Sequence, residues 1–262
     1  MHVTPKKRLG QHFLIDMEIA EKIVHSLQFT HTPILEIGAG TGVLTRFLMT
    51  QAKNEFKVVE IDAESIEYLQ QHYPELKENL IRHDFLQLDI ASLFSEPFAI
   101  IGNFPYNISS QILFKILDNK DVVTEVVGMF QKEVAERIVA DPGTKQYGIL
   151  SVLLQAFYDI EYLFTVDESK FLPPPKVKSA VIRMQRNPDK KLRCNEVLFK
   201  KVVKLAFNQR RKMLRNSLKS LLDDVQLDNP AILNLRPEQL SVAEFEKIVL
   251  NIEKKDVILQ LL

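Results

Sequence analysis

A short run near the middle of the chain joins an amide, a proline and an aromatic ring in the order Asn103–Phe104–Pro105–Tyr106. The side-chain oxygen of Asn103 and the carbonyl oxygen of Pro105 can accept hydrogen bonds from the two N–H groups of an amine, because proline fixes the local backbone. Tyr106 can stack on a base, which contributes about 1–3 kcal/mol in comparable complexes. The run therefore predicts a site that activates the exocyclic amine of a base such as adenine. A turn that merely ends a strand is the alternative.

Three glycines, Gly38, Gly40 and Gly42, alternate with other residues directly after the apolar run Ile34–Ile37. Glycine lets a backbone approach a ligand closely and adopt a positive φ angle. Open α/β sheets bind nucleotides at such turns, at the carboxyl end of a strand. The dinucleotide pattern places glycine at its sixth position, where this chain has Val43. The turn is therefore more typical of methyltransferases that bind S-adenosylmethionine than of nicotinamide enzymes, and a turn without a ligand is the alternative.

Two acids stand at the ends of the next two predicted strands. Glu60 lies 22 residues after Gly38, close to the spacing at which an acid meets ribose hydroxyls. Asp84 can accept a hydrogen bond from the adenine amine of a cofactor, while Phe85 or Ile61 packs against the adenine ring. Each acid alone is also explained as a solvated charge at a strand end. Three successive strand ends with a glycine turn and two acids argue against coincidence.

These residues need a scaffold that brings strand ends together. The first two thirds of the chain alternate β-rich runs with helical patterns, which is typical of βα units and a parallel sheet. Seven strands are expected over residues 34–37, 56–61, 80–83, 98–101, 125–130, 160–166 and 177–185, with helices over 42–51, 63–72, 109–117, 132–140 and 147–157. The last two strands can pair antiparallel at one edge, and Pro173–Pro175 between them require a rigid loop. The sequence therefore predicts an α/β fold with a mostly parallel seven-stranded sheet and an antiparallel edge hairpin.

The pattern changes after Asn187–Pro188–Asp189, where the strand signals end. Residues 195–222 have helical periodicity, and Arg236–Pro237–Glu238 resembles a helix start with proline in the first turn. We therefore expect a first domain over residues 1–188 and a small all-α domain over residues 189–262.

The net charge is zero, but the charges are unevenly distributed. Between Lys190 and Lys219 there are 11 basic residues and one acid, Glu196. Such an excess predicts a polyanionic partner whose binding depends on salt, and the lack of interleaved aromatics favours a structured RNA backbone. A solvated charged face is the alternative. The candidate RNA-binding residues are Lys200, Lys204, Arg210, Arg211, Lys212 and Arg215.

The remaining composition narrows the class of protein. The single cysteine, Cys194, excludes an internal disulfide framework and a cysteine-cluster metal site, and no metal is expected. No apolar run approaches the roughly 18 residues that span a bilayer, and the basic start lacks the apolar core of a signal peptide. We expect a cytoplasmic protein without a membrane partner. A monomer is favoured because no long apolar stripe is evident.

The motifs together resemble the ribosomal RNA adenine dimethyltransferase family, and its bacterial small-subunit branch in particular. The matching stretches run from Lys7 to about Leu222 and are Arg8–Leu14, Glu36–Gly40, Glu60, Asp84, Asn103–Tyr106, Phe171–Ser179 and Ala206–Asn216. The resemblance implies a Rossmann-like class I methyltransferase that uses S-adenosylmethionine. It further implies N6,N6-dimethylation of two adjacent adenosines near the 3′ end of 16S rRNA, in a 30S or pre-30S particle, with a role in subunit biogenesis.

The resemblance also assigns roles to residues. Gln11, His12 and the backbone of Leu14 would contact the cofactor, although the family more often has asparagine at the position of His12. Phe171 would flank the flipped target base, with core packing as the alternative. The residues expected to bind the cofactor are Gln11, His12, Leu14, Gly38, Gly40, Glu60, Ile61, Asp84, Phe85 and Asn103. Those expected to act on the acceptor base are Asn103, Pro105, Tyr106 and Phe171.

Three other functions remain open at this point. A large-subunit adenine methyltransferase shares the earlier motifs but is not expected to have the run Arg210–Asn216. An assembly factor whose binding matters more than its chemistry is a second possibility, although an intact Asn103–Tyr106 run favours catalysis. A nicotinamide oxidoreductase is disfavoured by Val43 and by the Asn-x-Pro-Tyr run.

Overall fold

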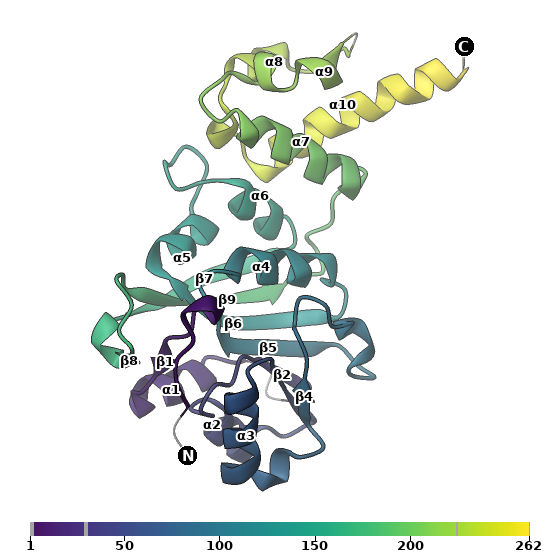
Figure 1. Ribbon diagram of the computed structural model, residues 1–262. Helices are drawn as coiled ribbons and strands as arrows, with labels where there is room; N and C mark the ends of the chain where they lie inside the picture. Colours follow the sequence, from purple (N-terminus) through teal and green to yellow (C-terminus); the bar gives the residue numbers. More distant parts are fainter. Residues whose placement is uncertain (1–2, 29–30, 224, 262) are drawn as a thin grey trace. The chain divides into compact units, whose positions relative to one another are not determined.

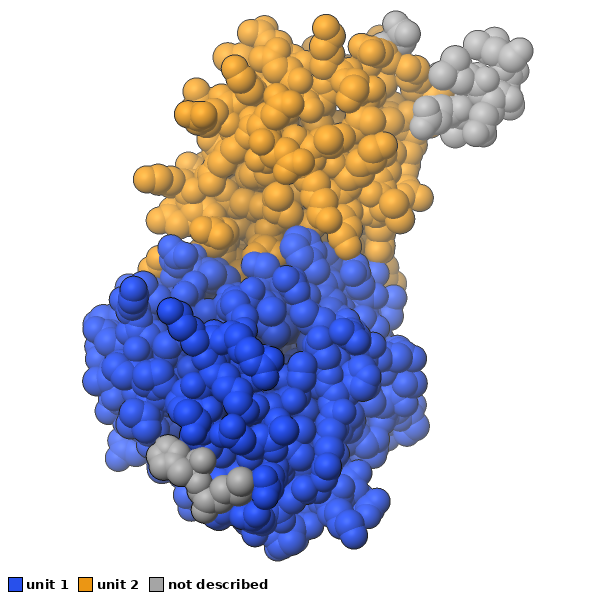
Figure 2. Space-filling model, in the orientation of Figure 1, with its two compact units in different colours: residues 1–135, 159–186 blue, residues 136–158, 187–262 orange. Residues whose placement is uncertain are grey.

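The computed structural model describes residues 3–28, 31–223 and 225–261, with side chains up to residue 255. The chain forms two compact units, coloured separately in Figure 2. One unit contains residues 1–135 and 159–186, and the other contains residues 136–158 and 187–262. The segment 136–158, which the sequence analysis grouped with the strands, thus clusters with the second unit.

A seven-stranded sheet forms the centre of the first unit (Figure 1). The strands are β2 (Ile34–Ile37), β3 (Phe56–Glu60), β4 (Leu80–Arg82), β5 (Phe98–Asn103), β6 (Val123–Gln131), β7 (Tyr158–Val166) and β9 (Ser179–Arg186). Their order is β4-β3-β2-β5-β6-β9-β7. The first five strands in this order pair in parallel, and β9 pairs antiparallel with β6. The predicted mostly parallel sheet with an antiparallel edge is confirmed.

The order of the strands leaves a crevice at one edge of the sheet where a ligand can bind. β2 lies between β3 and β5, so the chain leaves β2 toward one edge of the sheet and later returns to its other side. The loops after β2 and β5 therefore diverge, and open α/β sheets bind ligands in the crevice that such a reversal leaves at the carboxyl ends of the strands. Strand β5 is buried on both faces, since Phe98–Ile101 are at most 1% exposed, as expected for a central parallel strand.

Helices connect and flank these strands. They are α1 (Met17–Val24), α2 (Thr45–Gln51), α3 (Ala63–His72), α4 (Ser109–Asp118), α5 (Lys132–Val139) and α6 (Ile149–Gln155), and short 3-10 helices cover Lys7–Leu9, Pro74–Leu76, Ile90–Ser92 and Glu168–Lys170. Helix α1 begins at Asp16, whose side chain accepts a hydrogen bond from the Ile19 amide, a common N-cap arrangement. The five helices expected between the strands are all present; α3 has the predicted bounds and the other four differ from them by a few residues.

A second, two-stranded sheet was not expected. Strand β1 (Phe13–Leu14) pairs antiparallel with β8 (Phe171–Leu172), so Phe13 lies opposite Leu172 and Leu14 opposite Phe171. This pairing joins the N-terminal segment to the loop that carries Pro173–Pro175. Two-residue strands leave no periodic pattern in a sequence, and this explains why the pairing was missed.

The helical part of the second unit corrects one prediction. The expected continuous helix over residues 195–222 is wrong, because the chain forms α7 (Glu196–Asn208), a turn, α8 (Leu214–Ser217) and α9 (Lys219–Leu222). The Leu214 amide donates to the Leu235 carbonyl instead of continuing the helix. The turn places Arg210–Lys212 just after the carboxyl end of α7, where the helix dipole favours positive charge.

The chain ends with two 3-10 helices, Pro230–Asn234 and Pro237–Gln239, followed by α10 (Val242–Leu261). Proline stands in the first turn of the second of these, as the sequence predicted. Among the residues that the structure describes, no helix is long and apolar enough to cross a membrane.

Candidate active site

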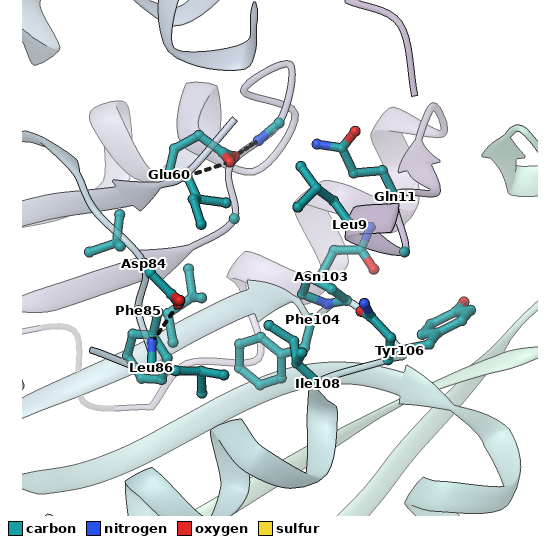
Figure 3. A pocket seen from close by; sticks show the side chains of 18 of the residues that line it. Leu9, Gln11, Glu60, Asp84, Phe85, Leu86, Asn103, Phe104, Tyr106 and Ile108 are labelled. Atoms are coloured by element: carbon teal, nitrogen blue, oxygen red, sulfur yellow. Dashed lines mark hydrogen bonds between the residues drawn. The ribbon is translucent and has the colours of Figure 1, made fainter. Parts of the chain in front are cut away.

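A cavity of about 220 Å³ opens at the carboxyl ends of β2, β3, β4 and β5. Figure 3 shows Glu60, Asp84 and Phe85 on one side of the cavity, Gln11 and Tyr106 on the other, and Asn103 between them. The described residues that line it are Arg8–Phe13, Ile37, Gly38, Gly40, Val59–Ile61, His83–Leu86 and Asn103–Ile108. The structure thus gathers residues from four strand ends and the N-terminal segment around one space.

The glycine turn after β2 borders this cavity. Gly38 has φ 71° and Gly40 has φ 58°, a left-handed conformation that residues with a side chain adopt rarely. A Cβ atom at Gly38 would meet no heavy atom of a described residue within 4 Å, whereas one at Gly40 would lie 2.8 Å from the Phe13 ring. Glycine at 38 therefore leaves space open, and glycine at 40 lets Phe13 pack against the backbone.

Glu60 fixes the turn to the end of β3. Its carboxylate accepts hydrogen bonds from the amides of Gly40 at 2.9 Å, Ile61 at 2.8 Å and Asp62 at 2.9 Å. Burial raises the pKa of the Glu60 carboxyl, and the three amide hydrogen bonds oppose that shift. A carboxylate has about four acceptor positions, so Glu60 retains capacity for a ligand hydroxyl.

The side of the cavity beside β3 and β4 suits a flat ring. Ile61 is 52% exposed although it is apolar, while Phe85 is 4% exposed. The Asp84 carboxylate accepts a hydrogen bond from the Leu86 amide at 2.9 Å, which fixes its orientation. Two apolar side chains and an oriented acceptor are the groups that an adenine ring with its amine requires.

Asn103 and Tyr106 occupy the opposite side. The Asn103 side-chain nitrogen donates to the His12 carbonyl at 2.9 Å, which turns the amide so that its oxygen faces away from His12. The Tyr106 ring stacks against the His12 ring, with centroids 5.5 Å apart, and its hydroxyl forms a hydrogen bond with the Ser179 hydroxyl. Burial raises the pKa of Tyr106, and the hydrogen bond with Ser179 opposes that shift.

Comparison with known proteins identifies the family. A family model described as ribosomal RNA adenine dimethylase matches residues 3–254. The chain belongs to this family. The chain is an S-adenosylmethionine-dependent methyltransferase.

Two bacterial relatives carry the name ribosomal RNA small subunit methyltransferase A. The protein from Parabacteroides distasonis is 58% identical over 254 residues, which cover 96% of this chain and 95% of the relative. The protein from Cytophaga hutchinsonii is 58% identical over 246 residues, which cover 93% and 95%. The chain is thus similar to these small subunit methyltransferases over nearly its full length.

Solved structures agree with the class I methyltransferase fold of the family. A dimethyladenosine transferase from Plasmodium falciparum has a TM-score of 0.77 at 26% identity, covering 94% of this chain and 98% of that one. The 23S rRNA methyltransferase ErmE has a TM-score of 0.63 at 26% identity, covering 92% and 99%. The predicted Rossmann-like fold is confirmed.

Two predicted site residues lie outside the main cavity of this adenine dimethylase. Phe171 is 2% exposed, belongs to the hydrophobic core and is absent from the described residues that line the cavity. Its position opposite Leu14 in the β1–β8 pair places it inside, as the core-packing alternative expects, and the base-flanking role stays a prediction. Leu14 is 3% exposed and lines a smaller adjoining cavity together with Glu36 and Asn103.

Glu36, in the stretch Glu36–Gly40 that carries the family resemblance, is a buried acid within strand β2. Its carboxylate accepts a hydrogen bond from the Thr45 hydroxyl at 2.7 Å. Burial raises the pKa of Glu36 to about 8, with Thr45 opposing and Glu60 adding to the shift. A residue that the predicted site did not include is Phe104, which is 1% exposed and lines the cavity.

The predicted RNA-binding residues all lie in the second unit. Arg211, Lys212, Lys204 and Arg215 are exposed, and Lys200 is half-buried. Arg210 differs from them, because its guanidinium donates to the Lys145 carbonyl at 2.6 Å and lies 3.8 Å from the Glu238 carboxylate. These contacts tie the basic turn to the loop between α5 and α6 and to the 3-10 helix Pro237–Gln239.

Proposed function

We propose that this chain transfers methyl groups from S-adenosylmethionine to the N6 amine of two adjacent adenosines near the 3′ end of small-subunit ribosomal RNA, giving N6,N6-dimethyladenosine. The observation that carries the proposal is the position of the Asn103–Tyr106 run beside the glycine turn, at one cavity. The names of the relatives at 58% identity support the choice of the small subunit.

The chain's own residues fit this cofactor. S-adenosylmethionine supplies a methyl group that its sulfonium has already activated. Gly38 and Gly40 let the cofactor approach the backbone of the turn that borders the cavity. Glu60 accepts hydrogen bonds from the ribose hydroxyls of the cofactor. Ile61 and Phe85 pack against adenine while Asp84 accepts from its amine. We further assign Gln11 and the Leu14 backbone to the amino-acid end of the cofactor.

The acceptor site works by positioning and electrostatics. The lone pair of the adenine amine is delocalised into the ring, so the amine is a weak nucleophile. The Asn103 oxygen and the Pro105 carbonyl accept its two hydrogens and draw the nitrogen toward a tetrahedral shape, which frees the lone pair. Tyr106 stacks on the base. With an activated donor, orientation and preorganised acceptors supply the catalysis, and a dedicated general base is not required.

RNA binding is proposed for the helical part, residues 189–262. Exposed Lys204, Arg211, Lys212 and Arg215, with Lys200, carry the charge that neutralises phosphates. Arg210 holds the turn in place through Lys145 and adds charge beside it. The substrate is a 30S or pre-30S particle, the protein acts as a monomer in the cytoplasm, and methylation accompanies subunit biogenesis.

One experiment tests the substrate. The protein is incubated with labelled S-adenosylmethionine and unmethylated small subunits, large subunits or free ribosomal RNA, and the label is mapped by position. Label at two adjacent adenosines near the 3′ end of the small-subunit RNA is expected. Label on the large subunit would favour the function named for ErmE, and binding to small subunits without any label would favour an assembly factor.

A further inference from the structure

Helix α4 continues directly from the loop that carries the acceptor residues. Ile108, the last residue of that loop, lines the cavity, and α4 begins at Ser109. Lys115 follows Ile108 by seven residues, which is about two helical turns, so the two side chains leave the helix on about the same side. Lys115 is half-buried and is not among the described residues that line the cavity. Any effect of Lys115 on a ligand must therefore pass through the residues that it contacts.

Lys115 contacts the turn that follows β4. Its Nζ atom donates a hydrogen bond to the Leu86 carbonyl at 2.9 Å and lies 5.5 Å from the centroid of the Phe85 ring. This separation is within the roughly 6 Å at which a cation and an aromatic ring attract each other. Burial lowers the pKa of Lys115, and the charges of Asp84 and Asp89 oppose that shift. The two carboxylates therefore favour the position of the ammonium beside the turn.

The same turn forms the proposed adenine site. The Leu86 amide donates to the Asp84 carboxylate at 2.9 Å, so Leu86 is held by Asp84 at its amide and by Lys115 at its carbonyl. Asp84, Phe85 and Leu86 all line the cavity, and Figure 3 shows them together on one side of it. A turn that is fixed before the ligand arrives loses less conformational entropy when the ligand binds.

We propose that Lys115 is a positioning residue for the adenine of S-adenosylmethionine and acts through Asp84 and Phe85. This inference rests on the proposed function, in particular on the assignment of these two residues to adenine. Loss of the ammonium releases both the Leu86 carbonyl and the Phe85 ring, so the turn no longer holds Asp84 in one orientation. The preference of the cavity for a ring that carries an amine should therefore fall.

The test measures that preference with two ligands that differ only in the ring. Calorimetry gives the Kd of S-adenosylhomocysteine and of S-inosylhomocysteine, in which an oxygen replaces the adenine amine. The wild-type protein is expected to bind the adenosyl ligand at least about tenfold more tightly, because Asp84 would face the inosine oxygen without a hydrogen to accept. The ratio of the two Kd values reports on the ring, since the ribose and the amino-acid end are the same in both ligands.

Lys115→Met keeps an unbranched apolar stem but cannot donate a hydrogen bond or carry a charge. It is expected to weaken binding of the adenosyl ligand about tenfold and to reduce the ratio to about threefold or less, because a hydrogen bond to an unfixed acceptor contributes little. Lys115→Arg retains a charged donor and should recover most of the ratio. Urea unfolding checks that each variant is folded in the assay, and Lys115→Gln is measured against the same expectations if Lys115→Met is not.

Lys57 in β3 provides a matched control. Its Nζ atom also donates to a backbone carbonyl, that of Leu93, and lies 4.7 Å from the centroid of the Phe94 ring. Lys57 is half-buried like Lys115 and is not among the described residues that line the cavity. Lys57→Met thus removes the same kind of contact elsewhere in the first unit, and the wild-type ratio is expected for it.

A wild-type ratio in folded Lys115→Met overturns the inference, even if both ligands bind more weakly, since equal weakening indicates a general structural role. A ratio that falls equally in Lys57→Met overturns it as well. Asp84→Asn tests the underlying assignment separately, because its amide can donate to the inosine oxygen and should lower the ratio. If Asp84→Asn keeps the wild-type ratio, the proposed adenine site fails first and takes this inference with it. If only Asp84→Asn lowers the ratio, the adenine site stands and the role of Lys115 is wrong.

Discussion

At the scale of single residues, the chemistry depends on the direction of one amide oxygen. The Asn103 nitrogen is engaged by the His12 carbonyl, so the oxygen is left as the acceptor for an amine. A donor or acceptor fixed before the reaction needs no reorganisation during it. Asn103 is consequently the residue whose loss should separate catalysis from cofactor binding.

Asn103→Ala is expected to slow single-turnover methyl transfer about 100-fold or more, the usual effect of removing one preorganised polar group. Cofactor Kd, measured by calorimetry, should stay within a few-fold. Asn54→Ala is a matched control, because Asn54 also donates from its amide to a histidine carbonyl, that of His31, on an exposed loop. Near-normal turnover by Asn103→Ala would remove this residue from the chemistry.

Glu36 should give the protein a pH-dependent stability. Burial raises the pKa of its carboxyl to about 8, against about 4.5 in the ordinary state. The contribution of Glu36 to the free energy of unfolding is therefore complete below about pH 4.5. It is lost as the pH rises toward 8, because the carboxyl ionises at a lower pH in the unfolded chain than in the folded protein. One such group changes the free energy of unfolding by at most about 1.4 kcal/mol per pH unit.

Glu36→Gln should reduce this decrease in the free energy of unfolding with rising pH. Urea unfolding at a series of pH values measures the decrease. The comparison variant is Glu75→Gln, since Glu75 is exposed in a 3-10 helix and should leave the pH dependence unchanged. Curves for wild type and Glu36→Gln that run parallel between pH 5 and 8 would contradict the raised pKa.

At the scale of elements, the turn after β2 joins the glycines to both Glu60 and Phe13. Gly40→Ala introduces a side chain at φ 58°, 2.8 Å from the Phe13 ring. A left-handed residue with a Cβ costs about 1–2 kcal/mol, and Phe13 must also move. We expect a lower free energy of unfolding and a cofactor Kd at least about tenfold weaker, since the turn lines the cavity.

Gly143→Ala is a control that introduces backbone strain without changing the turn that lines the cavity. Gly143 has φ 87°, and its Cβ would meet no heavy atom of a described residue within 4 Å. This variant should lose similar stability in denaturant titrations and keep cofactor Kd unchanged. Equal cofactor affinity in the two variants would show that the turn does not form the binding site.

The elements differ in how far the sequence could predict them. β2 and α3 have the predicted bounds, since continuous apolar runs and helical periodicity are local signals. The β1–β8 pair joins residues that are far apart in the chain, and such pairing is not encoded locally. The break after Asn208 was missed because periodicity continues across the turn, whereas the Leu214 amide pairs with Leu235.

The site was predictable to the extent that its residues stand at strand ends. Glu60 and Asn103 end their strands, and Gly38 and Asp84 follow theirs. Because these four strands are parallel, the meeting of the residues at one cavity follows from topology. Phe171 carried no sign of its burial, because a single phenylalanine occurs in cores and at binding sites alike.

At the scale of the whole molecule, a ribosomal RNA methyltransferase must bind both RNA and its cofactor, and the charge distribution assigns these two tasks to different residues. The chain has 34 basic and 34 acidic residues, so long-range attraction to RNA cannot come from net charge. The local excess between Lys190 and Lys219 lies in the second unit, whereas the residues that line the cavity belong to the first. Affinity for the particle and affinity for the cofactor should therefore respond to different substitutions.

Replacing Arg210, Arg211 and Lys212 together by glutamate tests that separation. Each phosphate contact contributes about one unit to the dependence of log affinity on log salt concentration, through released counterions. The triple variant should bind small subunits more weakly and show a slope lower by about two to three units, with cofactor Kd unchanged. Reversal of Lys53, Lys77 and Arg82, which are exposed in the first unit, alters net charge equally and should leave the slope near wild type. If both triple variants flatten the slope alike, RNA responds to overall charge; if neither does, RNA binds through other residues.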